Sequence, residues 1–132
     1  SPNNPTGFQF SNKDLEKLIK SFSGPIIIDE AYGEFSNSSV LSLVKKHSNV
    51  ILVKTLSKAF GLAGLRIGYM IADKKFSEIF SNVIQYPYPL NTLAIECGIL
   101  AIEKSKQIIS IFETTSNFRF SAESDVSDET IL

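Results

Sequence analysis

The chain has 132 residues, enough for one domain with a hydrophobic core, and 43% of them are hydrophobic and 20% charged. This composition is typical of a globular protein and excludes an intrinsically disordered chain. Lys and Arg together number 13 against 14 for Asp and Glu, a formal net charge of −1 that gives no reason to expect nucleic acid or an anionic membrane as a partner. The apolar runs are strand-sized, far below the roughly 18 residues of a membrane-spanning helix.

The sequence contains one cysteine, Cys97, and therefore cannot form an internal disulfide. No signal segment opens the chain, and both features predict a protein of the reducing cytoplasm. A lone cysteine is more often a small buried apolar residue than a nucleophile. We expect no metal site.

The first half of the chain predicts alternating helices and strands. The first seven residues are turn formers, and a capping box formed by Ser11 and Asp14 then opens an amphipathic helix. Three consecutive isoleucines after Gly24 and Pro25 predict a short strand buried on both faces. In order, helix, strand, helix and strand are predicted over residues 11–22, 26–28, 38–47 and 50–54.

The second half predicts a strand over 67–72, a helix over 74–85 and a long helix over 90–113. In the long helix, apolar residues at helical spacing are expected to be buried. Residues 114–132 are rich in Ser, Asp and Glu, with a short strand predicted over 117–120. The residues expected on the buried faces of the long helix are Leu93, Ile95, Leu100, Ile108 and Ile111.

This order predicts an α/β fold in which parallel strands are joined by helical crossovers. In such folds ligands bind beyond the carboxyl ends of the strands. Asp29 follows the strand at 26–28, and Lys58 follows the strand at 50–54. Both residues are therefore expected at the ligand-binding edge of the sheet.

The most specific motif is Thr-Leu-Ser-Lys-Ala-Phe-Gly-Leu-Ala-Gly-Leu-Arg-Ile-Gly-Tyr over residues 55–69. A lysine amine attacks an aldehyde only when neutral, which desolvation or a neighbouring cation favours. The hydroxyls of Thr55 and Ser57 could donate to phosphate oxygens, and the guanidinium of Arg66 could pair with the same anion. The motif therefore indicates a site for a phosphorylated aldehyde held by Lys58.

Together with Asn-Pro-Thr-Gly at 4–7 and Asp-Glu-Ala-Tyr at 29–32, this motif resembles the fold-type-I aminotransferases, which depend on pyridoxal phosphate. Within them it looks most like the histidinol-phosphate aminotransferases, and the Tyr-Pro-Tyr-Pro-Leu-Asn segment at 86–91 adds to this likeness. The resemblance implies the large cofactor-binding domain of that fold, a mostly parallel sheet flanked by helices.

The resemblance also implies a role for each matched position. Lys58 would be the catalytic residue and hold the cofactor as a Schiff base. The other matched residues would bind the cofactor at its phosphate, at its phenolic oxygen and at its pyridine nitrogen. These are, respectively, Thr55, Ser57 and Arg66; Asn4 and Tyr32; and Asp29. Glu30 and Glu34 are interpreted as solvated surface charges, and His47 as an exposed residue at a helix end.

Members of this family are much longer chains, so we expect this sequence to represent a fragment. Residues 1–113 would form part of the large domain and the start of its connection to the small domain, and residues 114–132 a remnant of the small domain. The implied reaction is transamination of histidinol phosphate with 2-oxoglutarate, in histidine biosynthesis, by a homodimer. Two alternatives stay open: a decarboxylase of a phosphorylated amino acid that uses the same cofactor, and an inactive truncated chain.

Overall fold

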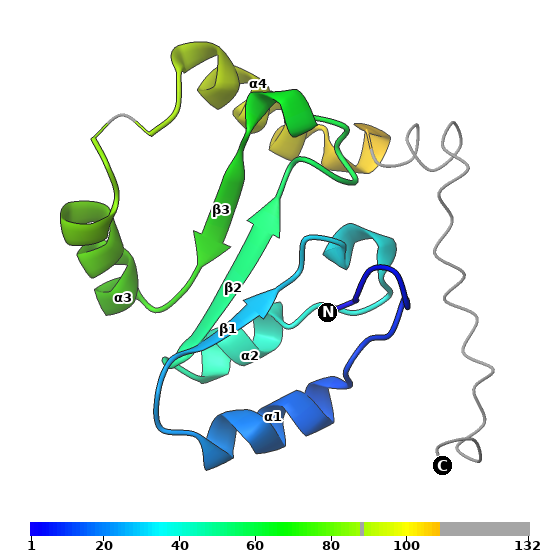
Figure 1. The fold of residues 1–132 in the computed structure, drawn as a ribbon, viewed down its shortest axis with the longest axis vertical. Helices are drawn as coiled ribbons and strands as arrows, with labels where there is room; N and C mark the ends of the chain where they lie inside the picture. Colours follow the sequence, from blue (N-terminus) through cyan, green and yellow to red (C-terminus); the bar gives the residue numbers. More distant parts are fainter. Residues whose placement is uncertain (88, 109–132) are drawn as a thin grey trace.

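The computed structural model describes residues 1–87 and 89–108, and a three-stranded sheet lies at its centre (Figure 1). The strands β1 (Ile26–Asp29), β2 (Val50–Thr55) and β3 (Gly68–Ile71) lie in that order across the sheet. β1 and β2 are parallel, which confirms the predicted helical crossover, whereas β3 runs antiparallel to β2. The connection from β2 to β3 contains only the short 3-10 helix η2 (Ala63–Leu65), and a crossover helix is not needed to join antiparallel strands.

Two helices cover one face of this sheet. Helix α1 (Asn12–Ser21) begins after Ser11, whose hydroxyl accepts from the Asp14 backbone amide at 3.1 Å, as the capping box predicted. Helix α2 (Leu41–Lys46) forms the crossover between β1 and β2. Together they bury the first hydrophobic core, which consists of Leu15, Ile19, Ile28, Val40, Leu43, Val44, Val50 and Leu52.

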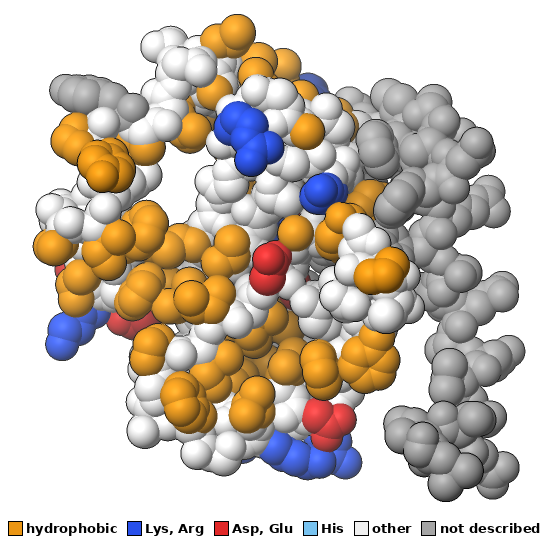
Figure 2. Space-filling model, viewed as in Figure 1, with side chains coloured by type: hydrophobic (Ala, Val, Ile, Leu, Met, Phe, Trp, Pro, Cys, Tyr) orange, Lys and Arg blue, Asp and Glu red, His pale blue; other side chains and the backbone are white. Residues whose placement is uncertain are grey.

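The opposite face of the sheet is apolar and open among the described residues. The prediction that the strand at 26–28 is buried on both faces is wrong, because Ile28 is 6% exposed but Ile27 is 67% exposed. Helix α3 (Lys74–Ile79) and the π-helical turn η3 (Phe80–Ile84) flank a groove on this face. Figure 2 shows hydrophobic side chains gathered over β3, α3 and the neighbouring sheet. The groove is lined by Ile27, Ile51, Val53, Met70, Phe76 and Phe80, among others.

A second core lies where helix α4 (Thr92–Glu103) packs beside the β2–β3 loop (Figure 1). The residues of α4 that face this core are the small ones, Ala94, Gly98 and Ala101. Space is tight there, since a Cβ atom added at Gly98 would lie 3.2 Å from the Ile67 Cδ1 atom. The predicted burial of Leu93, Ile95 and Leu100 is therefore wrong, and these side chains are 66%, 44% and 55% exposed. The buried members of the second core are Leu56, Ala59, Phe60, Ile67, Ala94 and Ala101, and Ile108 packs against them.

The predicted long helix is interrupted at Lys104, the C-cap of α4, and its last residues, Ile111 among them, lie outside the described part of the chain. The predicted strand at 117–120 and the predicted domain boundary after residue 113 also lie outside it. Within residues 1–87 and 89–108, no helix is long and apolar enough to cross a membrane. The same residues contain no group of three or more His, Cys, Asp or Glu side chains that could hold a metal ion.

Candidate active site

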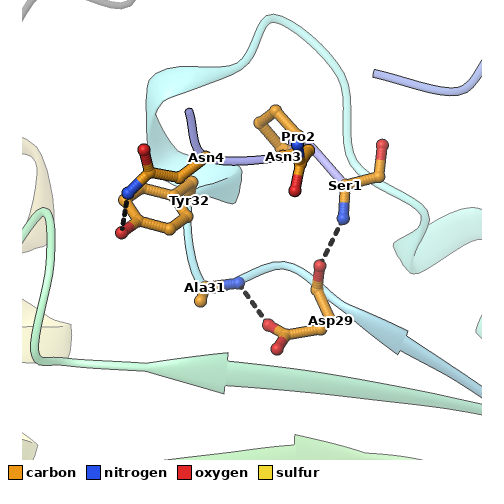
Figure 3. Close-up of a pocket in the computed structure, with 7 residues that line it drawn as sticks. All are labelled: Ser1, Pro2, Asn3, Asn4, Asp29, Ala31 and Tyr32. Carbon is orange, nitrogen blue, oxygen red and sulfur yellow. Dashed lines mark hydrogen bonds between the residues drawn. The ribbon is translucent and has the colours of Figure 1, made fainter. Parts of the chain in front are cut away.

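A pocket of about 290 Å³ opens beyond the carboxyl end of β1, where the amino-terminal loop meets the turn after the strand (Figure 3). Two backbone hydrogen bonds close this loop, from the Gly7 amide to the Asn3 carbonyl and from the Asn3 amide to the Phe8 carbonyl. The residues lining the pocket are Ser1, Pro2, Asn3, Asn4, Asp29, Ala31 and Tyr32.

Two side-chain hydrogen bonds join residues that line this pocket to one another. The Asn4 side-chain amide donates to the Tyr32 hydroxyl at 2.8 Å, and Figure 3 shows the two groups facing each other. One carboxylate oxygen of Asp29, Oδ1, accepts from the backbone amide of Ala31 at 2.7 Å. This local bond is typical of an aspartate that initiates a turn, and here it fixes the carboxylate at the strand end.

Lys58 approaches the same pocket from the loop after β2. Its amine lies 5.5 Å from the centroid of the Tyr32 ring, within the range of a cation–π contact. The loop is anchored because Leu56 and Ala59, on either side of Ser57 and Lys58, are fully buried in the second core. Lys58 itself is exposed and therefore accessible to a ligand.

The two hydroxyl residues of the motif differ in what their hydroxyls do. Thr55 Oγ1 donates to the Ile67 carbonyl at 3.2 Å and accepts from the Ser57 amide at 3.1 Å. Its single proton is therefore used inside the loop in this conformation, and the Thr55 hydroxyl shapes the β2–β3 connection. Ser57 is half-buried beside Lys58.

Arg66 adopts a left-handed backbone conformation, with φ 55° and ψ 41°. It is the one non-glycine residue with positive φ within the described part of the chain. Such conformations are costly for residues with a Cβ atom and cluster at functional sites. The Arg66 side chain is exposed, and its guanidinium donates to the Ala63 carbonyl at 3.4 Å.

The structure thus brings together Asn4, Asp29 and Tyr32 in one pocket and joins Lys58 to them through the Tyr32 ring. Thr55, Ser57 and Arg66 lie on the neighbouring loop and are not among the residues that line the pocket. The donor set fits the cofactor that the resemblance implies. A carboxylate can pair with a ring nitrogen, an amide and a phenol can donate to a phenolic oxygen, and a lysine can bind an aldehyde.

The interpretation of Glu30 and Glu34 as solvated surface charges is wrong. Glu30 is fully buried, and the Glu34 side chain is 10% exposed. Lys54 joins them, with its amine 3.2 Å from Glu30 Oε2 and 2.8 Å from Glu34 Oε1. Burial alone would lower the pKa of the Lys54 amine, but hydrogen bonds and charge from Glu34 and Glu30 outweigh it and hold that pKa above its ordinary value.

The sequence contained a signal for this cluster. Side chains alternate between the two faces of a strand, so Lys54 shares a face with Val50 and Leu52, both in the first core. A lysine on a buried face needs an anionic partner. His47, predicted as exposed, is also partly buried, with a side chain 15% exposed and a ring nitrogen 3.2 Å from Glu16.

The sequence model of the class I and II aminotransferases matches residues 1–126, and the chain belongs to this family. Histidinol-phosphate aminotransferase of Buchnera aphidicola subsp. Schizaphis graminum is 45% identical over 107 residues, which are 79% of this chain and 30% of that protein. The chain therefore spans about 30% of the length of this relative.

Solved structures support the same fold. The histidinol-phosphate aminotransferase of Sinorhizobium meliloti, in complex with pyridoxal-5'-phosphate, is 25% identical with a TM-score of 0.74, over 84% of this chain and 31% of that one. The L-threonine-O-3-phosphate decarboxylase of Porphyromonas gingivalis is 28% identical with a TM-score of 0.73, over 86% of this chain and 37% of that one. The described elements are thus part of a fold shared by enzymes of two reaction types.

Proposed function

We propose that the protein containing this chain is a pyridoxal-phosphate-dependent aminotransferase that uses histidinol phosphate as amino donor and 2-oxoglutarate as acceptor. The observation that carries the proposal is the meeting of Asn4, Asp29 and Tyr32 in one pocket, with Lys58 against the Tyr32 ring. The choice of donor is supported by the 45% identity to a relative of that name. A homodimer and a cytoplasmic location, both expected from the sequence, stay predictions.

Each residue has a task in this proposal. Asp29 pairs with the pyridine nitrogen and keeps it protonated, and Asn4 and Tyr32 hold the phenolic oxygen. The phosphate is held by Ser57, Thr55 and Arg66. The guanidinium of Arg66 can form two parallel hydrogen bonds to that dianion. Thr55 would exchange its hydrogen bond to the Ile67 carbonyl for one to a phosphate oxygen.

The chemistry divides between the cofactor and Lys58. When bound, pyridoxal phosphate draws electrons from the α-carbon of the amine substrate and so makes its proton removable. With the cofactor bound, the Lys58 amine would be the group that takes this proton as a general base and returns it as a general acid.

The first experiment tests whether Lys58 is the residue that binds pyridoxal phosphate covalently. The purified protein is mixed with pyridoxal phosphate, its visible absorption is recorded, and borohydride reduction followed by peptide mass analysis locates the modified residue. A visible band trapped on Lys58, and absent from Lys58→Ala, is expected. Lys45→Ala is the matched control, because Lys45 is an exposed lysine of α2 and its loss should leave the band unchanged. A band retained by Lys58→Ala, or trapped on another lysine, would refute the assignment.

A second candidate function is decarboxylation of a phosphorylated amino acid, favoured by the similarity to the Porphyromonas gingivalis enzyme at 28% identity and a TM-score of 0.73. Both candidates need the same anchor, so substrate assays separate them. Glutamate formed from 2-oxoglutarate in the presence of histidinol phosphate supports the aminotransferase. Carbon dioxide released from O-phosphothreonine without a 2-oxo acid supports the decarboxylase. The third alternative, an inactive truncated chain, predicts neither product.

A further inference from the structure

Glu30, Lys54 and Glu34 form a buried ion cluster, and Glu30 directly follows Asp29 of the candidate site in the sequence. Glu30 is fully buried, and its Oε1 accepts from the Val40 backbone amide at 2.6 Å. Its Oε2 accepts from the Ser39 hydroxyl at 2.9 Å and from the Lys54 amine at 3.2 Å. The carboxylate is therefore bonded to the segment before α2 and to β2 at the same time.

Lys54 is the cation of the cluster. Its side chain is 13% exposed, and its amine contacts both carboxylates, at 3.2 Å for Glu30 and 2.8 Å for Glu34. The second oxygen of Glu34, Oε2, is buried and has no hydrogen-bond partner among the described residues. Glu34 thus depends on Lys54, because a buried carboxylate without a partner is strongly unfavourable.

The cluster connects the two segments that carry the site. Glu30 stands between Asp29 and the Tyr32 turn, and its backbone is tied at both ends: its amide donates to the Val53 carbonyl, and its carbonyl accepts from the Gly33 amide, each at 2.9 Å. Lys54 immediately precedes the segment that leads to Lys58. A backbone shift of the Tyr32 turn relative to β2 would therefore strain bonds of this cluster.

The packing of Gly33 shows how closely the turn is held. A Cβ atom added to Gly33 would lie 2.9 Å from the Glu30 Cβ atom and 3.2 Å from the Lys54 amine. The turn that carries Tyr32 therefore packs against the Glu30–Lys54 ion pair without space for a side chain at Gly33. Buried ion pairs contribute little to stability compared with apolar side chains of similar size, but their directional bonds restrict geometry.

We propose that Glu30, Lys54 and Glu34 are positioning residues that fix the Tyr32 hydroxyl relative to the Lys58 amine at the cofactor site. This inference rests on the proposed function and extends it to residues that do not line the pocket. Lys54 is the central member, since it holds both carboxylates.

The test uses the purified protein with pyridoxal phosphate and follows the visible band as a function of pH, together with thermal unfolding. The midpoint is the pH at which half of the bound cofactor has lost its proton, read from the visible band. A hydrogen bond from the Tyr32 hydroxyl to the phenolic oxygen favours the deprotonated form. If Tyr32 is displaced, this bond weakens and the midpoint rises. Lys54→Met and Glu30→Gln are both expected to raise the midpoint, by an amount on the order of one pH unit. Lys54→Arg, which keeps the cation, is expected to restore most of the wild-type value.

The direction of the two shifts makes the test decisive. A through-space charge effect would move the midpoint up in Lys54→Met, which removes a cation, but down in Glu30→Gln, which removes an anion. Shifts of opposite sign therefore overturn the proposal. Val44→Ala is the control for stability, because it removes buried volume from the first core and is expected to lower the unfolding temperature without moving the midpoint.

Unchanged midpoints with lowered unfolding temperatures in the cluster variants would also overturn the proposal and leave only a structural role. If Lys54→Met does not fold, Glu34→Gln serves in its place and is expected to raise the midpoint by a smaller amount. A wild-type protein with no visible band refutes the proposed function itself, and this inference with it, before any variant is compared.

Discussion

The Lys58 amine lies 5.5 Å from the centroid of the Tyr32 ring, although the two residues follow different strands. Lys58 belongs to the loop after β2, and Tyr32 to the turn after β1. Because β1 and β2 are parallel, their carboxyl ends meet at one edge of the sheet, where Asp29 pairs with Val53. The contact is thus a direct consequence of the topology, and it places the Lys58 amine over a ring whose hydroxyl accepts from the Asn4 side-chain amide.

We expect Asn4 and Tyr32 to act as one unit on the cofactor's phenolic oxygen. Tyr32→Phe removes the hydroxyl but keeps the ring near Lys58, and Asn4→Ala removes the amide that donates to that hydroxyl at 2.8 Å. Each change should weaken pyridoxal phosphate binding, measured by fluorescence titration. The double variant should lose less than the sum, with a coupling of roughly 0.5–3 kcal/mol, as for residues in one hydrogen-bond network. If the losses of binding free energy in the two single variants add up to that of the double variant, Asn4 and Tyr32 do not act as one unit.

Arg66 is expected to show a trade-off between stability and binding. Its backbone is left-handed at φ 55°, so Arg66→Gly should raise the free energy of unfolding of the cofactor-free protein by about 1 kcal/mol. Loss of the guanidinium should weaken pyridoxal phosphate binding by roughly 10-fold or more. Arg66→Lys keeps the backbone cost and a charge, and should bind with intermediate affinity at unchanged stability. If Arg66→Gly binds pyridoxal phosphate as tightly as wild type, Arg66 does not bind the phosphate.

The strands, and the placement of Asp29 and Lys58 at one edge of the sheet, could be predicted from the sequence because their signals are local. Apolar runs mark the three strands, and Asp29 and Lys58 follow directly after two of them, so parallel pairing was enough to bring them to one edge. The antiparallel direction of β3 depends instead on the short η2 connection, which a strand pattern does not reveal.

The buried charges and the faces of α4 could not be predicted in the same way, because both depend on contacts distant in sequence. Glu30 is fully buried and pairs with Lys54, which lies 24 positions away. In α4 the large apolar residues are exposed and Gly98 packs inward, since Ile67 of a separate loop comes too close for a larger side chain. Hydrophobic periodicity assigns burial by residue type, and here the close approach of two segments decided it.

The pH dependence of stability is expected to report on Glu16. Hydrogen bonds from Lys46, Lys20 and His47 lower the pKa of the Glu16 carboxyl from 4.5 to about 2. A depressed folded-state pKa gives stabilisation that is complete above the unfolded value and is lost as pH falls through the folded value. The difference in free energy of unfolding between wild type and Glu16→Gln should therefore shrink between pH 4.5 and about 2.

Urea denaturation of the purified protein at a series of pH values checks this expectation. The ion pairs of Glu16 lie at the surface, where salt screens them, so the difference should be larger at low ionic strength. A difference that does not vary with pH across this window would show that Glu16 titrates normally.

The packing of the Tyr32 turn on the ion cluster predicts that Gly33 tolerates no side chain. A Cβ atom at this position would lie 3.0 Å from Glu30 Oε2 and 3.2 Å from the Lys54 amine. Gly33→Ala should therefore lower the free energy of unfolding by about 1–3 kcal/mol, the usual cost of overpacking. Gly64→Ala is the matched control, because a Cβ atom there meets nothing within 4 Å and the change should stay within about 0.5 kcal/mol of wild type.

The same pair of variants also separates packing from function. Gly33→Ala displaces the turn that carries Tyr32, so it should weaken pyridoxal phosphate binding in addition to lowering stability, whereas Gly64→Ala should leave stability unchanged. Thermal unfolding and fluorescence titration of both variants supply the two measurements. If Gly33→Ala loses stability but binds the cofactor as tightly as wild type, the turn adjusts without moving Tyr32, and the geometry of the ion cluster does not reach the cofactor site.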